Sequence, residues 1–350
     1  MLKQKKLLLL LTMLAAAMVI SSRGGAAEWA DSVVIGGVVE IEAGFGEDYD
    51  GARQSDIVLA TVEIGMEAKL NERVSASVLL LYEEDDTPLE VDEGVIAVKL
   101  TPGGRWYLAG GQMYVPFGVF ESHLISDPLT SELGETRESA LLVGFESDVV
   151  YGSVYVFNGD VGTEDAIEDD EDVIDQMGLN LGVALENNAM SLDLGLSYIN
   201  NIADADLLSE MLAEGMVEGV DDYVSGLALH GILSIGPLTL IGEYVAADQF
   251  NDGELDFDGE GAQPVAANLE AGFGFDWQGR EATLAAAYQL SEEAVALELP
   301  ETRVMLGVAV EVFERTLLSV EYAYDEDYAE EEGGSGETAN TLTAQLAVEF

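Results

Sequence analysis

MSLDLGLSY, residues 190–198, is the stretch of sequence that decides the fold. Its large side chains, from Met190 to Tyr198, occupy every second position, and small or polar residues fill the positions between them. A period of two places successive side chains on opposite faces of a β-sheet, so we expect a strand with one apolar face. The same alternation recurs in residues 315–325 and 341–350.

Sixteen such runs follow one another along the chain, with fourteen or eighteen as alternative counts. Short turns and long loops alternate between them, and the long loops are expected near residues 46–55, 83–90, 115–138, 159–174, 201–221, 248–262, 291–300 and 326–337. Outer-membrane barrels have short periplasmic turns and long extracellular loops. Because unpaired backbone groups cannot face lipid, such a sheet must close on itself. We therefore predict an all-β fold, a transmembrane antiparallel up-and-down β-barrel in the bacterial outer membrane.

Aromatic residues mark both ends of the predicted strands. The ends next to the long loops carry Phe45, Tyr82, Tyr114, Phe157, Tyr198, Tyr244, Tyr288 and Tyr324, and the ends next to the short turns carry Trp106, Phe145, Tyr151, Trp277, Phe313 and Phe350. Amphipathic rings concentrate at headgroup level on both sides of a bilayer. A soluble β-sandwich would gather its aromatic residues in mid-strand, so this distribution favours a membrane barrel.

The first residues predict secretion. Three lysines between residues 3 and 6 precede the apolar run 7–20, and small residues end at Ala27. We predict a signal peptide over residues 1–27, with an uncleaved anchor as the alternative, and a single barrel domain over residues 28–350. The absence of cysteine excludes disulfides, zinc-thiolate sites and thiol catalysis.

The charge is extreme, because the chain has 68 acidic and 13 basic residues. A polyanion of this kind could not neutralise phosphates, so nucleic acid is excluded as a partner. Either solubility in a saline habitat or a cation-attracting pore explains the acidity. Strand alternation places several carboxylates on the inner face, among them Glu40, Glu63, Glu67, Glu243, Glu270 and Glu321.

The third long loop, residues 115–138, is the most informative connection. Long ordered loops are often functional, and a loop folded into the lumen would narrow the pore. The residues expected at such a constriction are Glu121, His123, Asp127, Glu132, Glu135 and Arg137. The alternative is a loop that packs only against its neighbours.

The remaining motifs predict no chemistry. The chain has two histidines, His123 and His230, and no serine, histidine and carboxamide fall on neighbouring strands at one depth. We therefore expect neither an enzyme nor a cofactor or metal site. The acidic run 164–172 is expected to be a solvated loop, with diffuse divalent-cation binding beside lipopolysaccharide as the alternative. Residues 206–220 predict a loop helix that packs on the barrel mouth or occludes it.

Several stretches carry a resemblance to a known family. They are residues 56–60, 79–93, the third loop, 154–160, 198–204 and 342–350. On these residues the sequence resembles the LbtU family of siderophore porins. The resemblance implies an outer-membrane barrel for passive ferric-siderophore uptake, without a plug domain. The expected partners are a small solute, for which the resemblance implies a ferric siderophore, together with outer-membrane lipid and lipopolysaccharide and the barrel assembly machinery.

The acidic lumen bears on which solute would pass. Many ferric siderophores are anionic, and inward carboxylates should repel them. Three explanations stay open: a neutral or cationic substrate, screening by salt, or a local path of positive charge through the lumen formed by Arg105, Arg137 and Arg303. The rival functions are a general cation-preferring porin and a surface structural or adhesive barrel.

Overall fold

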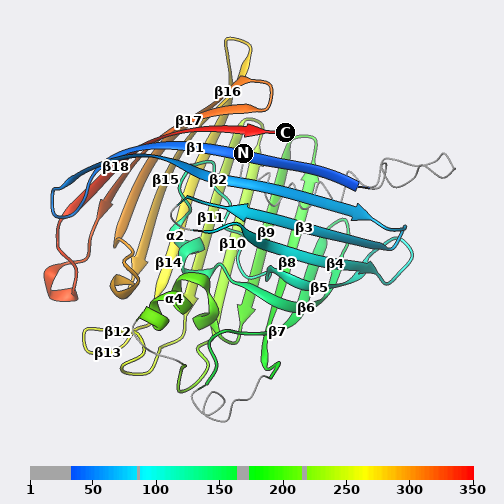
Figure 1. Ribbon diagram of the computed structural model, residues 1–350, viewed down its shortest axis with the longest axis horizontal. Helices are drawn as coiled ribbons and strands as arrows, with labels where there is room; N and C mark the ends of the chain where they lie inside the picture. The colour runs from blue at the N-terminus through cyan, green and yellow to red at the C-terminus, as the bar shows by residue number, and fades with distance from the viewer. Residues whose placement is uncertain (1–32, 85–86, 164–172, 215–218) are drawn as a thin grey trace.

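Sixteen strands of the described residues close into one antiparallel barrel (Figure 1). The computed structural model describes residues 33–84, 87–163, 173–214 and 219–350. Strand β1 (Val33–Glu47) pairs with β2 (Arg53–Lys69) on one side and with β18 (Thr338–Glu349) on the other. At this seam the backbones of Gly37 and Phe350 exchange two hydrogen bonds, of 3.2 and 3.1 Å. The predicted fold class and strand number are confirmed.

The other barrel strands follow in chain order, and each pairs with its neighbours. They are β3 (Val74–Tyr82), β4 (Glu90–Lys99), β5 (Trp106–Tyr114), β6 (Arg137–Glu146), β7 (Val150–Asn158), β8 (Gln176–Asn187), β9 (Met190–Ile199), β10 (Gly226–Ile235), β11 (Leu238–Ala247), β14 (Val265–Trp277), β15 (Arg280–Glu292), β16 (Thr302–Phe313) and β17 (Thr316–Glu326). A short hairpin of β12 (Asp256–Phe257) and β13 (Glu260–Gly261) stands outside the barrel sheet.

The outer face of the barrel is an apolar band. Leu194, Leu269 and Leu306 are 48, 64 and 53% exposed, and they lie in mid-strand. An exposed apolar surface of this extent is stable when hydrocarbon surrounds it, because water would be ordered around every such side chain. The alternation read from the sequence therefore places the apolar set toward lipid.

Most predicted girdle rings lie at this surface, but Tyr114, whose hydroxyl donates to the buried Asp92, does not, and neither do two rings of β7. Trp277 and Phe313 are 51 and 71% exposed at the short-turn end. Phe157 is fully buried on the inner face, and Tyr151 donates a hydrogen bond of 2.7 Å to Asp193 inside the barrel. Both assignments were wrong for one reason. The face of β7 that carries Tyr151 and Phe157 points into the barrel and not toward lipid, and because side chains alternate along a strand, an error of one residue in parity reverses every side chain.

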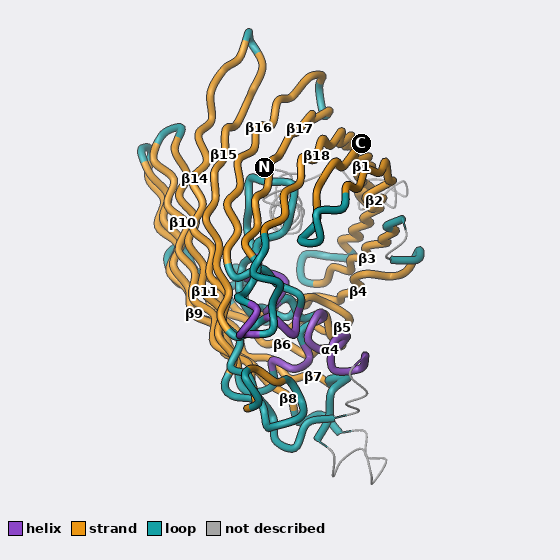
Figure 2. The backbone as a smooth tube through the Cα atoms, turned by 90° about the vertical axis from the view of Figure 1, so that its left-hand side faces the viewer, coloured by secondary structure: helices purple, strands orange, loops and turns teal. Residues whose placement is uncertain are grey.

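Long loops fill part of the barrel mouth. The third loop (residues 115–136) carries α2 (Leu129–Gly134), and the fifth loop carries η1 (Ile202–Asp204) and α4 (Asp206–Glu214). Figure 2 shows the helical segments, α4 among them, within the curve of the sheet. Their apolar side chains, together with those of neighbouring loops, form a core that includes Phe117, Leu129, Leu133, Leu208 and Leu212.

The remaining helical turns are η2 (Val295–Leu297) and η3 (Glu330–Glu332). Among the described residues, every helix is too short or too polar to cross a membrane. Helix α4 occupies the first part of the helix predicted over residues 206–220, and residues 215–218 lie outside the description. The predicted signal peptide and the acidic run 164–172 also lie outside the described residues.

Candidate functional site: the lumen and its third loop

The third loop enters the lumen and lies against the inner wall. Its first anchor is Glu243 on β11. The backbone N–H groups of Val119 and Phe120 donate to this carboxylate at 2.8 and 3.0 Å, and the Thr130 hydroxyl donates to it at 3.1 Å. Glu243 thereby holds both arms of the loop, before and within α2.

Two further wall carboxylates hold the tip of the loop. Glu270 on β14 accepts hydrogen bonds of 2.7 Å from the Ser122 hydroxyl and from the backbone N–H of His123. Glu321 on β17 accepts from the backbone N–H of Ile125 at 2.5 Å and from the Ser126 hydroxyl at 2.6 Å. The three anchors thus dock one continuous stretch of backbone.

The anchors differ from free lumen charges. Glu243, Glu270 and Glu321 are 5, 0 and 2% exposed, because the loop covers them. A buried carboxylate is tolerated when hydrogen-bond donors replace its water, and N–H and O–H donors do so here. These glutamates lie on the inner wall, as the sequence predicts, but they hold the loop and do not border an open passage.

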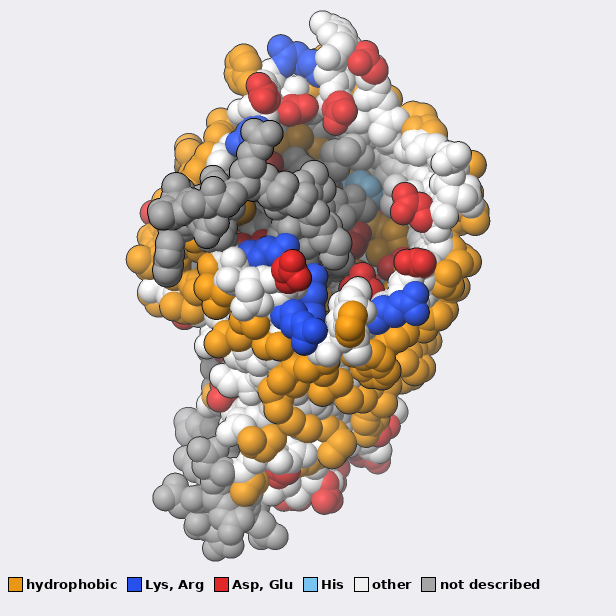
Figure 3. Space-filling model, turned by 90° about the vertical axis from the view of Figure 1, so that its right-hand side faces the viewer, with side chains coloured by type: hydrophobic (Ala, Val, Ile, Leu, Met, Phe, Trp, Pro, Cys, Tyr) orange, Lys and Arg blue, Asp and Glu red, His pale blue; other side chains and the backbone are white. Residues whose placement is uncertain are grey.

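A cavity of about 360 Å³ remains between the loop tip and the opposite wall. The loop contributes residues 123–127, and the wall contributes inward residues of β1, β2 and β15–β18. Its charged lining consists of the carboxylates Glu40, Glu42, Glu83, Glu84 and Asp127. No lysine or arginine stands among these described lining residues. Figure 3 shows a hollow in this face of the molecule that contains acidic side chains and a histidine.

The predicted constriction residues do not all meet at this cavity. His123 and Asp127 border it, whereas Glu121 does not. Glu132 lies in α2 and Glu135 caps the end of that helix, away from the loop tip. Of the predicted inward glutamates, Glu40 lines the cavity; Glu63 and Glu67 are buried on the wall and are not among its lining residues.

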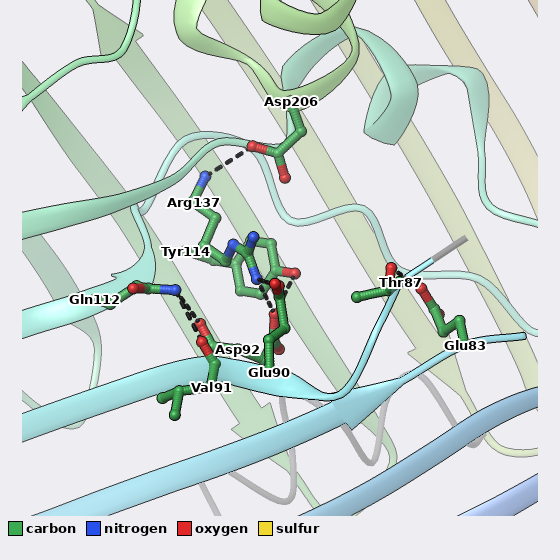
Figure 4. Close-up of polar contacts among 9 residues, drawn as sticks. All are labelled: Glu83, Thr87, Glu90, Val91, Asp92, Gln112, Tyr114, Arg137 and Asp206. Atoms are coloured by element: carbon green, nitrogen blue, oxygen red, sulfur yellow. Dashed lines mark hydrogen bonds and ion pairs between the residues drawn. The ribbon is translucent and has the colours of Figure 1, made fainter. Parts of the chain in front are cut away.

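Arg137 does not oppose the cavity acids, contrary to the prediction. Its Nη1 donates to Glu90 at 2.5 Å and to Asp92 at 2.8 Å (Figure 4). The Tyr114 hydroxyl also donates to Asp92, at 3.1 Å. A bulge in β4 opposite Leu79 supplies the extra residue that makes this cluster possible.

Arg303 is neutralised in the same way. Its Nε and Nη2 bind the two carboxylate oxygens of Asp325 at 2.8 and 2.9 Å. This bidentate pair spans β16 and β17. Two of the three arginines predicted to line the lumen, Arg137 and Arg303, therefore already have carboxylate partners. The third, Arg105, is exposed directly before β5, in a short turn.

The histidines do not form a catalytic group with a serine. His123 Nδ1 contacts Glu270 at 2.7 Å, while the Ser122 hydroxyl donates to the same carboxylate and not to the ring. His230 lies 3.4 Å from Asp193 and 3.2 Å from the Tyr151 hydroxyl. A serine nucleophile needs a ring nitrogen as its base, and no such contact occurs among the described residues.

Sequence reasoning missed the contribution of the second long loop. Glu83 and Glu84 follow β3 and reach the cavity, where Glu84 accepts a hydrogen bond of 2.7 Å from the backbone N–H of Leu59. Their position directly after a strand that ends in Tyr82 was the available signal. The sequence could not show that this loop, as well as the third, approaches the pore.

No family model matches the chain. Two other comparisons find similar proteins: relatives in sequence, and solved structures with a similar fold. The chain is 26% identical to a UPF0422 protein of Coxiella burnetii over 342 residues, which covers 91% of this chain and 72% of that protein. It is 27% identical to a UPF0422 protein of Legionella pneumophila, and it spans 66% of that protein's length. Neither name refers to a siderophore.

Solved outer-membrane channels share the fold. The outer membrane channel DcaP of Acinetobacter baumannii superposes with a TM-score of 0.61 at 14% identity, over 91% of this chain and 97% of that one. Pseudomonas putida OprB gives a TM-score of 0.63 at 9% identity, over 94% of this chain and 100% of that one. With the apolar outer band, this fold defines the class: the chain is a sixteen-stranded barrel of the bacterial outer membrane.

Proposed function

We propose that the chain is a passive, cation-preferring diffusion porin. The observation that carries the proposal is the cavity beside the third loop, whose charged lining is carboxylate alone. Fixed carboxylates concentrate cations and exclude anions, most strongly where low-dielectric walls focus the field. The proposal includes no catalytic step, because neither described histidine contacts a serine hydroxyl that it could activate as a nucleophile.

Current measurements in planar bilayers test this proposal. Under a KCl gradient we expect a reversal potential that favours K⁺, and a preference that weakens as salt rises because the Debye length shortens. The variant Glu42→Gln, which removes one cavity carboxylate, should lower the K⁺ preference. Glu281→Gln is the matched control, because Glu281 is an exposed inner-wall glutamate outside the cavity. Anion preference in the wild-type protein would overturn the charge argument.

Ferric-siderophore uptake is a second candidate, which the resemblance to siderophore porins favours. The acidic lining would admit neutral or cationic complexes in preference to anionic ones. Uptake of radiolabelled iron complexes of each charge by cells with and without the protein tests this role. Equal uptake in both strains for every complex would remove it.

The rival function, a structural or adhesive barrel, requires a closed lumen. It predicts no conductance, so the bilayer measurement separates it from a porin. We propose the remaining partners on the fold alone: lipid around the apolar band, lipopolysaccharide near the long loops, and the barrel assembly machinery at the β1–β18 seam.

A further inference from the structure

The cavity beside the third loop offers hydrogen-bond acceptors from both sides. His123 Nδ1 faces Glu270 at 2.7 Å, and a carboxylate can only accept, so this ring nitrogen carries the hydrogen. In the neutral ring, Nε2 is then an acceptor on the opposite side. The side chain is only 7% exposed and borders the cavity, and Nε2 forms no hydrogen bond within the described residues. The loop therefore presents one ring-nitrogen acceptor at the border of the cavity.

The facing wall presents carboxylate oxygens. Glu42 Oε1 accepts a hydrogen bond of 2.7 Å from Gln345 Nε2, which fixes the side chain across the β1–β18 seam. Glu42 Oε2 has no partner within the described residues. Glu40, Glu83, Glu84 and Asp127 add four more carboxylates to the same lining, and no lysine or arginine stands among the described lining residues. The cavity is thus matched to a ligand with several donors and a positive charge.

Part of the remaining lining is apolar, beside the polar side chains of Thr61, Ser126, Thr283, Ser319 and Gln345. Leu124 and Ile125 contribute from the loop, and Leu317 contributes from β17. Hydrocarbon segments can contact these side chains while charged ends reach the carboxylates. The volume of about 360 Å³ lies at the small end of ligand pockets, which suits a compact organic ion.

We infer that this cavity is a transient binding subsite for small aliphatic ammonium ions that carry several N–H donors, such as diamines. The inference rests on the proposed cation-preferring porin and names its preferred solute class. Passage through a pore requires binding that is strong enough to enter and weak enough to leave. His123 Nε2 and Glu42 are the specificity-determining acceptors, because they distinguish an N–H donor from a charge alone.

The test compares two dications on the wild-type channel in about 0.1 M KCl, where the Debye length is about 10 Å. The probes are 1,4-diaminobutane and its bis-quaternary, fully methylated analogue, which has the same charge and no N–H group. We expect saturable block of the K⁺ current, with a half-blocking concentration for the diamine about tenfold below that of the analogue. Equal block by the two probes, or no saturable effect of the diamine, overturns the inference.

A variant pair separates the subsite from general electrostatics. Glu42→Gln should raise the half-blocking concentration of the diamine about tenfold, and Glu281→Gln should leave it nearly unchanged. Equal shifts in the two variants contradict the assignment of Glu42. The wild-type comparison of probes does not depend on either variant folding. A channel that conducts without diamine selectivity contradicts only this inference, whereas a barrel that does not conduct contradicts the proposed function as well.

Discussion

Replacing Glu321 by Gln should release the tip of the third loop. This carboxylate accepts from the N–H of Ile125, and from both the N–H and the hydroxyl of Ser126. Glutamine keeps a single carbonyl oxygen, and its amide donors would face the loop's own donors. Because Glu321 is 2% exposed, water cannot readily replace the lost acceptor.

The magnitude follows from the number of contacts. Hydrogen bonds to a charged acceptor contribute about 1.5–3 kcal/mol each, and an unsatisfied buried donor costs about 1–3 kcal/mol. Loss of one to two such bonds weakens docking of the tip by about 2–4 kcal/mol, which shifts the docked-to-released equilibrium roughly 30- to 700-fold. The anchors at Glu243 and Glu270 should still hold the rest of the loop.

Hydrogen exchange at the Ile125 and Ser126 amides is the direct assay, with single-channel noise as a second readout. We expect faster exchange at these two amides and more frequent excursions to a larger conductance. Glu281→Gln makes the same charge change at an exposed position and should show neither effect. If the exchange rates of Glu321→Gln equal those of this control, the anchoring role of Glu321 is refuted.

Two further outcomes follow from local geometry. Burial raises the pKa of Asp204 in the fifth loop to about 6, despite the hydrogen bond of 2.7 Å that it accepts from the N–H of Val161. Ionisation of Asp204 therefore destabilises the folded loop, so the protection of the Val161 amide from hydrogen exchange should fall as pH rises from about 4 to 6 and then level off. The exchange rates are corrected for the intrinsic pH dependence of exchange. A rise in protection over that pH range would contradict the assignment. Gly195→Ala should destabilise the barrel by about 1–3 kcal/mol in urea unfolding, because a Cβ there would overlap the His230 ring. Gly242→Ala is the control, since a Cβ at Gly242 meets nothing within 4 Å, and equal effects of the two would reject this reason.

The sequence by itself determined the class of fold. Alternation with a period of two, as in Met190–Ile199, is a local property, and it needs a sheet with lipid on one side. Loop lengths are also local, so the sequence predicted the position and length of the third loop. The inward direction of Glu243, Glu270 and Glu321 followed from the same parity.

The tertiary structure alone decided what those inward residues do. The contacts between Glu270 and Ser122 join residues 148 positions apart, and those between Glu321 and Ile125 join residues 196 apart. A carboxylate that meets several N–H groups becomes a buried anchor, whereas Glu42, which accepts one hydrogen bond from Gln345, keeps its second oxygen for a solute. Strand parity gives a side chain's direction but not its partners, because the path of a long loop is set by packing within the closed barrel. For the same reason the sequence could not show that Glu90 and Asp92 neutralise Arg137, nor that the cavity has carboxylates and no lysine or arginine among its described lining residues.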